Sequence, residues 1–432
     1  MNFDGISNGR SCGYMEKKMN VLSLFSGCGG MDIGFEGGFR CLRKSINEKM
    51  HANRIESRDD VWVTLKKTIF DTIFANDIRP DAKAAWVSYF DKKKENANEI
   101  YHIGSIVDLV KRAKKGEKVF PEHVDVVTGG FPCQDFSISG KRKGFNSEKS
   151  HVGGKLSADE PSVESRGQLY MWMREVITIT EPSLFIAENV KGLTNLEDAK
   201  EIIEQDFAQA GGNGYIVVPA QVLNAADYGV PQSRERVIFF GFKKSALTKD
   251  ALNALTAKHI SEDFDPYPPK THSYTKEDEI LSSVVTCSEA FVDLEEPEET
   301  TDPSQRAYSK AKFMGRHCQG QTEIKINGIG PTIRSEHHGN IEYRRLSAEH
   351  GGKIDEELDD GLEERRLTVR ECARIQTFPD DYNFILKKTE QNVSVSASDA
   401  YKIVGNAVPC MLAYNIAQHL SERWERYFGD KK

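Results

Sequence analysis

Short runs rich in apolar residues alternate with longer amphipathic stretches through residues 21–242. Continuous runs of this length, bounded by glycine or polar residues, are typical of buried strands. They occur at residues 21–25, 72–75, 124–127, 184–187, 215–218 and 236–242, and helical stretches occupy residues 169–179 and 199–210. This alternation predicts an α/β fold with a doubly wound, mostly parallel sheet that binds ligands at the carboxyl ends of its strands.

The alternation ends near residue 243, where the chain becomes rich in proline, threonine and acidic residues. Helical periodicity returns at residues 368–376 and 408–423. We therefore predict a polar tail over residues 1–20, a large domain over residues 21–242, a smaller irregular domain over residues 243–395 and a C-terminal segment over residues 396–432. Residues 40–70 form a charged excursion, longer than an ordinary connection between two strands.

The cysteines indicate a reduced protein. The chain of 432 residues has eight scattered cysteines, no C-x-x-C pair and no signal-peptide pattern, so we expect cytoplasmic thiols. His317-Cys318 and His337-His338 lack a second ligand pair at zinc-finger spacing, and we predict no metal. No apolar run is long enough to cross a bilayer.

The formal net charge of -8 is unusual for a protein that binds nucleic acid. The acidic residues are concentrated at 293–302 and 355–364, whereas residues 306–316 (RAYSKAKFMGR) are basic and carry aromatic side chains. Because binding depends on the local field, acidic loops exposed to solvent can set the total without contacting a ligand. The net charge therefore does not exclude DNA as a partner.

A glycine-rich loop follows the first predicted strand and opens a helix, where a backbone can approach a ligand closely. It differs from the dinucleotide fingerprint and lacks the Lys-Ser/Thr of a phosphate-binding loop, which favours S-adenosylmethionine as the ligand. A tight structural turn is the alternative. Asp77 ends the second strand and is our candidate for the ribose hydroxyls; Glu48, which ends no apolar run, ranks second. The loop consists of Phe25, Ser26, Gly27, Cys28, Gly29 and Gly30.

A cysteine follows the strand at residues 124–127, within the segment 129–134 (GGFPCQ). Cys133 is therefore predicted on a loop at the carboxyl edge of the sheet, where an exposed, electropositive setting makes a thiolate reactive. The alternative is a small buried hydrophobic residue. The adjacent Pro132 and the preceding glycines favour a fixed, exposed loop.

Residues 129–145 (GGFPCQDFSISGKRKGF) resemble the catalytic loop of bacterial DNA cytosine-5 methyltransferases. The ordered series of residues 188–190 (ENV), 232–236 (QSRER), 370–374 (RECAR) and 405–409 (GNAVP) is similar to the motif series of that family. The resemblance extends over nearly the whole chain from residue 21. It implies a Rossmann-like methyltransferase sheet, a target-recognition domain over residues 243–395 and a C-terminal segment that returns to the catalytic domain.

The resemblance also implies a covalent mechanism. Carbon 5 of cytosine is a weak nucleophile until the Cys133 thiolate, flanked by Pro132 and Gln134, adds to carbon 6. Negative charge then moves toward ring nitrogen 3, which the Glu188 carboxyl should face as an acid. Glu188 ends the strand at residues 184–187, where burial would raise its pKa; its alternative role is a helix cap. Asn189 belongs to the same block.

Two arginines of the QSRER block complete the expected catalytic site. Arg236 should donate to the cytosine carbonyl oxygen. Arg234 should support the same pocket or bind a phosphate, and a structural salt bridge is its alternative.

Further cofactor contacts are implied by the family alone. Asn406 should return to the cofactor pocket, although by itself it would be an ordinary helix start. Ile106 and Leu169 match positions that line the adenine, with apolar core as the alternative. In one departure, Ser105 stands where the family has an acid that contacts the adenine.

A base stacked inside a duplex cannot present carbon 6 to a thiol, so the nucleotide must be flipped out. The irregular region over residues 243–364 occupies the place of the family's target-recognition domain, which reads base edges in the major groove. We place residues 306–316 and 331–345 against DNA; polar loops without a ligand are the alternative.

We therefore predict a cytoplasmic, monomeric DNA cytosine-5 methyltransferase that converts S-adenosylmethionine to S-adenosylhomocysteine, acts on double-stranded DNA, has no membrane partner and pairs functionally with a restriction endonuclease. A tRNA cytosine-5 methyltransferase of the same fold is the first alternative, and the sizeable recognition region opposes it. A binding protein that has lost the chemistry is the second, and the intact motif blocks oppose that.

Overall fold

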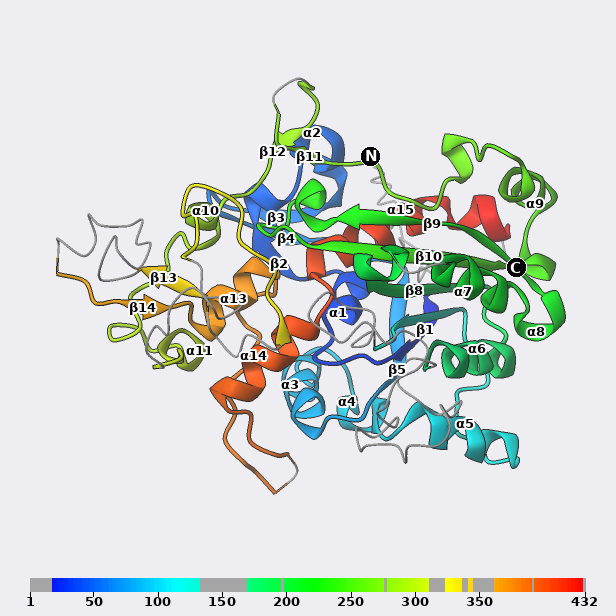
Figure 1. Ribbon diagram of the computed structural model, residues 1–432, viewed down its shortest axis with the longest axis horizontal. Helices are drawn as coiled ribbons and strands as arrows, with labels where there is room; N and C mark the ends of the chain where they lie inside the picture. Colours follow the sequence, from blue (N-terminus) through cyan, green and yellow to red (C-terminus); the bar gives the residue numbers. More distant parts are fainter. Residues whose placement is uncertain are drawn as a thin grey trace, which may run out of the picture.

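A seven-stranded sheet forms the centre of the computed structural model, in the strand order β6-β5-β1-β7-β8-β10-β9 (Figure 1). The structure describes residues 18–132, 169–195, 198–275, 278–310, 323–335, 341–344, 361–390 and 392–429. Cys133, Gln134, His317, Cys318, His337 and His338 lie outside these residues. The strands are β1 (Met19–Leu24), β5 (Phe70–Asp77), β6 (Tyr101–Ile103), β7 (Val126–Gly130), β8 (Leu184–Val190), β9 (Tyr215–Asn224) and β10 (Glu235–Lys243).

The sheet is mostly parallel, as the sequence predicted. Strands β6, β5, β1, β7 and β8 pair in parallel, and β10 is antiparallel to both β8 and β9. Each of the six predicted strands is present, and β9 extends to Asn224, well past its predicted end at residue 218. The short edge strand β6 was not predicted, because three residues are too few for a pattern.

Helices cover both faces of the sheet and create two hydrophobic cores. Val21 and Ala75 point into one core with helices α1 (Gly30–Glu36), α3 (Pro80–Phe90) and α15 (Cys410–Phe428). Leu22 and Phe74 point into the other core with α5 (Ile106–Lys114), α6 (Leu169–Thr180) and α7 (Ala199–Ala208). Because successive strand residues face opposite sides, continuous apolar runs were the correct signal for a sheet buried on both faces. The doubly wound α/β class is therefore confirmed.

The last helix packs against the first one. A Cβ atom at Gly34 would lie 2.4 Å from the Ala413 Cβ, so α1 and α15 approach at a distance that only glycine permits. The first and last α-helices thus meet on one face of the sheet.

The charged excursion forms a small antiparallel sheet in the order β2-β4-β3, from β2 (Arg40–Leu42), β3 (Ile55–Arg58) and β4 (Trp62–Leu65), with α2 (Glu48–His51) between β2 and β3. Arg54 pairs with Glu422 of α15 at 3.0 Å, and the Trp62 Nε1 donates to the Asp293 carboxylate at 3.1 Å. The excursion therefore connects α15 to the region that follows β10.

That following region is irregular, as predicted. It contains α9 (Lys249–Thr256), α10 (Cys287–Ala290), α11 (Pro303–Arg306), α13 (Val369–Ile375), α14 (Ala397–Asn406) and the two- or three-residue strands β11 (His272–Ser273), β12 (Ser282–Ser283), β13 (Glu342–Arg344) and β14 (Arg365–Arg366). Figure 1 places α10, α11, α13, β13 and β14 on the left, opposite the sheet. The short helices α4 (Ala97–Ile100) and α8 (Ala210–Asn213) belong to the sheet side of the molecule.

Three acids of the run at residues 293–302 have a structural role in addition to their contact with solvent. Each of these acids pairs with an almost fully buried arginine: Asp293 with Arg374, Glu296 with Arg365 and Asp302 with Arg370. A buried guanidinium requires such partners, so these carboxylates hold the irregular region together.

Across the ranges that the structure describes, no helix has both the length and the apolar character needed to cross a membrane.

Candidate active site

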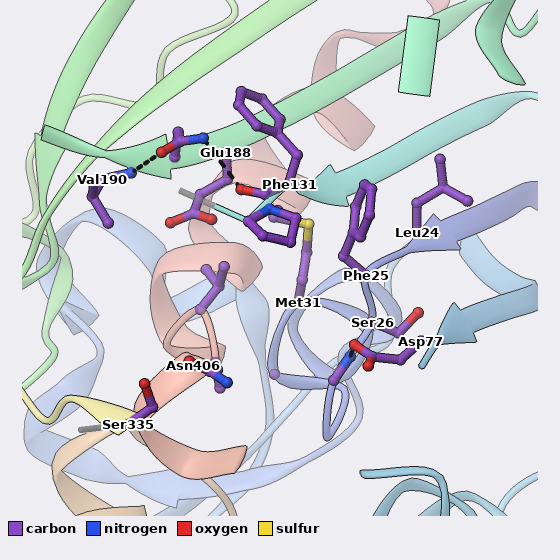
Figure 2. Close-up of a pocket in the computed structure, with 18 of the residues that line it drawn as sticks. Leu24, Phe25, Ser26, Met31, Asp77, Phe131, Glu188, Val190, Ser335 and Asn406 are labelled. Atoms are coloured by element: carbon purple, nitrogen blue, oxygen red, sulfur yellow. Dashed lines mark hydrogen bonds between the residues drawn. The ribbon is translucent and has the colours of Figure 1, made fainter. Parts of the chain in front are cut away.

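A cavity of about 650 Å³ opens at the carboxyl ends of the parallel strands and brings together most of the predicted site residues (Figure 2). Topology explains the convergence, because the carboxyl ends of adjacent parallel strands meet at one edge of the sheet. The predicted residues that line the cavity are Phe25, Ser26, Gly27, Gly30, Asp77, Ile106, Pro132, Leu169, Glu188, Asn189, Arg234, Arg236 and Asn406.

The glycine-rich loop between β1 and α1 has an unusual backbone. Phe25 has a φ of 53°, in the left-handed region that non-glycine residues rarely adopt. A Cβ atom at Gly30 would lie 2.2 Å from the Val408 carbonyl oxygen. The loop is therefore pressed against the residues after α14, and its strained backbone is of the kind found at ligand sites.

Two residues of this loop do not line the cavity. The Cys28 thiol is buried and donates to the Ile403 carbonyl at 3.2 Å, and burial raises its pKa. Gly29 lies against the Trp86 ring, since a Cβ atom there would lie 2.5 Å from the Trp86 Cδ1. The Cys28 side chain and the α-carbon of Gly29 therefore pack against the protein interior, and the predicted cofactor contact of these two residues stays a prediction.

Asp77 lies at the end of β5, where the sequence placed it. One carboxylate oxygen accepts from the Gly27 amide at 3.0 Å and the other from the Arg79 amide at 3.0 Å, and burial raises the Asp77 pKa. Glu48, the second candidate, lies on α2 and pairs with Arg43 and Arg58 instead. The geometry favours Asp77 as the acid of the cavity.

The neighbouring wall of the cavity is apolar. Ile78 lines it with 40% of its surface exposed, and sequence reasoning missed it although it directly follows the strand-ending acid. Ser105 also lines the cavity, and its hydroxyl caps α5 by accepting from the Val107 amide at 3.3 Å. The serine that replaces an acid here thus has a structural role as well.

Asp32, which the sequence analysis did not select, supports the loop from beneath. Its carboxylate accepts from the Ser23 hydroxyl at 2.5 Å and from the Trp86 Nε1 at 2.7 Å. The Ser26 hydroxyl lies 2.9 Å from that of Ser23, which extends the network into the cavity wall. Burial raises the pKa of Asp32 to about 6. The sequence signal that could have identified Asp32 as a buried acid is its position within the otherwise apolar segment 31–35 (MDIGF).

We expect Asp32→Asn to remove a pH dependence of stability. The folded-state pKa exceeds the unfolded value, so the native state holds this proton more tightly and wild-type stability falls as the pH rises from about 4 to about 7. The difference between the folded and unfolded pKa values of Asp32 corresponds to about 3 kcal/mol in the free energy of unfolding. Urea unfolding of both proteins across this range measures it, with Asp206→Asn on α7 as the control. Parallel pH curves for wild type and Asp32→Asn would contradict the expectation.

Glu188 and Arg236 form a buried ion pair in the cavity wall. The Arg236 Nε lies 2.7 Å from a Glu188 carboxylate oxygen, and each residue is 8% exposed. They come from antiparallel neighbours, the end of β8 and the start of β10. A Cβ atom at Gly130, the last residue of β7, would lie 2.7 Å from the other Glu188 oxygen. The strand that leads to Cys133 therefore runs directly beside the carboxylate.

Asn189 fixes the backbone at this point. Its side-chain amide donates to the Phe131 carbonyl at 3.2 Å, and its oxygen accepts from the Val190 amide at 2.8 Å, as the dashed lines in Figure 2 show. Pro132, the last described residue before Cys133, lines the cavity. Asn189 is thus a positioning residue for the segment that carries the predicted nucleophile.

Arg234 has a different environment from Arg236. It is 2% exposed, and its guanidinium donates to the carbonyls of Ile333, Gly405 and Ala407. These contacts favour support of the pocket wall over a phosphate contact or a salt bridge.

Asn406 is the last residue of α14, so it ends a helix and does not start one. Figure 2 shows its side chain next to that of Ser335, in the wall of the cavity.

The cavity has features that S-adenosylmethionine requires. A carboxylate at a strand end suits ribose hydroxyls, an open glycine loop admits a close backbone approach, and Ile78, Ile106 and Leu169 supply an apolar surface for a flat base. The same cavity contains Glu188 and Arg236, so a methyl donor and an acceptor base would share one enclosure.

Comparison with known proteins agrees with this site. The C-5 cytosine-specific DNA methylase family model matches residues 19–422. The chain is 32% identical to the type II methyltransferase M.BsuRI of Bacillus subtilis, over 94% of this chain and 80% of that protein. It is 32% identical to the type II methyltransferase M.BspRI of Lysinibacillus sphaericus, over 96% and 85% of the two chains.

A solved structure shows the same fold. A DNA modification methyltransferase encoded within an E. coli prophage superposes with a TM-score of 0.54 at 19% identity, covering 94% of this chain and all of that one. With the family model spanning nearly the entire sequence, the chain belongs to the C-5 cytosine-specific DNA methylase family and is a DNA cytosine-5 methyltransferase.

Proposed function

We propose that this enzyme transfers a methyl group from S-adenosylmethionine to carbon 5 of a cytosine that is flipped out of a specific duplex DNA sequence, through a transient covalent bond to Cys133. The observation that carries the proposal is the single cavity that contains both Asp77 beside the glycine loop and the Glu188–Arg236 pair next to Pro132.

The residues act in a defined order. The Cys133 thiolate forms a bond to carbon 6, and Glu188, as an acid, donates to ring nitrogen 3 while Arg236 donates to the ring carbonyl oxygen. S-adenosylmethionine supplies the electrophilic methyl group. The bond between the donor's sulfonium sulfur and the methyl group would break as carbon 5 bonds to the methyl carbon, which would leave S-adenosylhomocysteine. A base then removes the carbon 5 proton, and the bond between Cys133 and carbon 6 breaks to restore the ring and the thiolate.

Cofactor contacts follow from the lining residues. Asp77 would accept from the ribose hydroxyls, Ile106 and Leu169 would hold the adenine, and Asn406 together with the loop backbone from Phe25 to Gly30 would hold the remainder. The Cys28 side chain and the Gly29 α-carbon shape that loop by packing beneath it.

DNA binds on the side of the cavity formed by the irregular region. Thr332 and Arg334 of residues 331–335 line the cavity, and Arg306 and Lys310 lie in the described part of residues 306–316. We assign residues 21–242 to the catalytic domain, 243–395 to target recognition and 396–432 to the returning segment. The tight packing of α15 on α1 supports that last assignment.

The biological setting is inferred from the relatives. Both are named type II methyltransferases, so we propose that this enzyme protects DNA from a partner restriction endonuclease. We further propose that it acts as a monomer in the cytoplasm, where Cys133 stays reduced.

Incubation with radiolabelled S-adenosylmethionine tests the proposal, using duplex DNA and tRNA as separate substrates. We expect label in the DNA only, at carbon 5 of one cytosine within a recurring sequence. Label confined to tRNA would establish the alternative substrate, and the absence of label from both would remove the catalytic function.

A further inference from the structure

Two buried side chains of the QSRER block have no place in the proposed chemistry: Arg234 forms part of the cavity wall, and Gln232 does not line the cavity. Gln232 is fully buried and Arg234 is 2% exposed. They lie between β9 and β10, shortly before Arg236 at the active site. Burying a guanidinium is costly unless its donors are satisfied, so the partners of these two residues indicate what the block does.

One set of partners belongs to the segment that we place against DNA. Arg234 Nη1 donates to the Ile333 carbonyl at 2.7 Å, and the Gln232 side-chain oxygen accepts from the Ile333 amide at 2.9 Å. The Thr332 hydroxyl donates to the Ser233 carbonyl. Both backbone polar groups of Ile333 and the side chain of Thr332 are therefore hydrogen-bonded to the QSRER block.

The other set of partners belongs to the segment that carries Asn406. Arg234 Nη2 donates to the carbonyls of Gly405 at 3.0 Å and Ala407 at 2.9 Å, the residues on either side of Asn406. One guanidinium thus joins the two segments, which its planar fork of donors permits and a lysine ammonium does not reproduce.

A second buried amide reinforces the same connection. The Gln232 side chain donates to the Gln376 side-chain oxygen at 2.9 Å, and Gln376, also fully buried, donates to the carbonyls of Val404 and Ala407 at 2.8 and 3.2 Å. Arg234, Gln232 and Gln376, which we call the arginine–glutamine clamp, therefore attach one segment to the other through side chains alone.

The two segments are also in direct contact. A Cβ atom at Gly405 would lie 2.4 Å from the backbone of Arg334 and Ser335. Both segments line the same cavity, in which Figure 2 shows Ser335 facing Asn406. A displacement of residues 332–335 on DNA binding must therefore move the backbone around Asn406.

We propose that Gln232 and Arg234 are positioning residues that couple DNA binding to cofactor binding, so that each ligand raises the affinity of the enzyme for the other. The inference rests on the proposed function, because it takes residues 331–335 as a DNA contact and Asn406 as a cofactor contact. The coupling is reciprocal, since a ligand that orders one segment reduces the ordering that the second ligand must bring about.

The test is a ratio of affinities. Calorimetry gives the dissociation constant of S-adenosylhomocysteine without DNA and with a saturating duplex fragment that the wild type methylates. We expect about a tenfold tightening by DNA in the wild type. In Arg234→Lys and Arg234→Met the tightening should fall below about twofold, because the link between the segments is lost.

Control variants separate coupling from general damage. Arg426→Met removes an exposed arginine that pairs with Asp263 on the far end of α15, and we expect the wild-type ratio. Thr332→Val removes only the hydrogen bond to the Ser233 carbonyl, so it can be tested if the Arg234 variants do not fold. We expect DNA to tighten S-adenosylhomocysteine binding in this variant by a factor between those of the wild type and the Arg234 variants.

The outcomes are distinct. The clamp's role would be overturned if DNA tightened S-adenosylhomocysteine binding by the same factor in Arg234→Lys, in Thr332→Val and in the wild type. It would also be overturned if DNA did not change the dissociation constant of S-adenosylhomocysteine in a wild-type enzyme that methylates DNA. An enzyme that neither binds S-adenosylhomocysteine nor methylates DNA would overturn the proposed function instead.

Discussion

Cys133→Ala abolishes methyl transfer while leaving cofactor binding intact: this is the largest effect we expect. Without the thiolate, carbon 5 of cytosine is not activated, and loss of a covalent nucleophile costs about a thousandfold or more in turnover. Asp77 and Gly27, which we propose contact the cofactor, belong to β5 and the β1–α1 loop, so removal of the sulfur leaves the contact between them unchanged. Radiolabel incorporation and S-adenosylhomocysteine calorimetry measure the two properties separately.

A mechanism-trapping base gives the complementary result. A duplex with 5-fluorocytosine at the target position should form a covalent complex with the wild type, because fluorine at carbon 5 cannot leave as a proton does. Cys28→Ser is the matched cysteine control: its thiol is buried against Ile403, and the adduct should persist in it. An adduct in Cys133→Ala would assign the nucleophile to another residue.

Glu188→Gln is the second large expected effect, a loss of about a hundredfold to ten-thousandfold in turnover. Glutamine preserves the shape of the side chain and can still donate from its amide, but it cannot transfer a proton to ring nitrogen 3. It also leaves the buried Arg236 guanidinium without its carboxylate at 2.7 Å, which is strongly destabilising for a buried charge. Single-turnover rates on a saturating substrate isolate the chemical step from binding.

The destabilising part of this substitution needs its own control. Arg236→Gln breaks the same ion pair from the other side, so the two variants share the structural loss and differ in the group that meets the base. We expect similar unfolding midpoints in urea for the two, and a cofactor affinity near that of the wild type. Near-normal turnover in Glu188→Gln would exclude this carboxyl from proton transfer.

The Glu188–Arg236 ion pair holds both side chains in place before a base binds. Gly130 leaves room for the second carboxylate oxygen. Preorganised charges of this kind need no rearrangement when negative charge develops on the ring. The site therefore combines a rigid acid–arginine wall with a loop that Asn189 holds at Phe131.

The sequence alone determined the sheet and the chemical types at its edge. Strand positions followed from continuous apolar runs, and Asp77 and Glu188 could be placed because each ends such a run. Because the covalent chain fixes which residues follow a strand, the motif blocks at residues 188–190 and 232–236 contribute to the cavity lining, whereas residues 370–374 do not line it.

Only the tertiary structure decided which partners each side chain of the site has. Arg234 and Arg236 are two residues apart at the start of β10 and both line the cavity, yet one donates to backbone carbonyls and the other pairs with Glu188. Likewise, Asp32 lies under the loop because Trp86 is brought to it from α3. Local pattern specifies elements, whereas such pairings join residues far apart in the chain and exist only after those elements pack, because hydrogen bonds and ion pairs require contact distances.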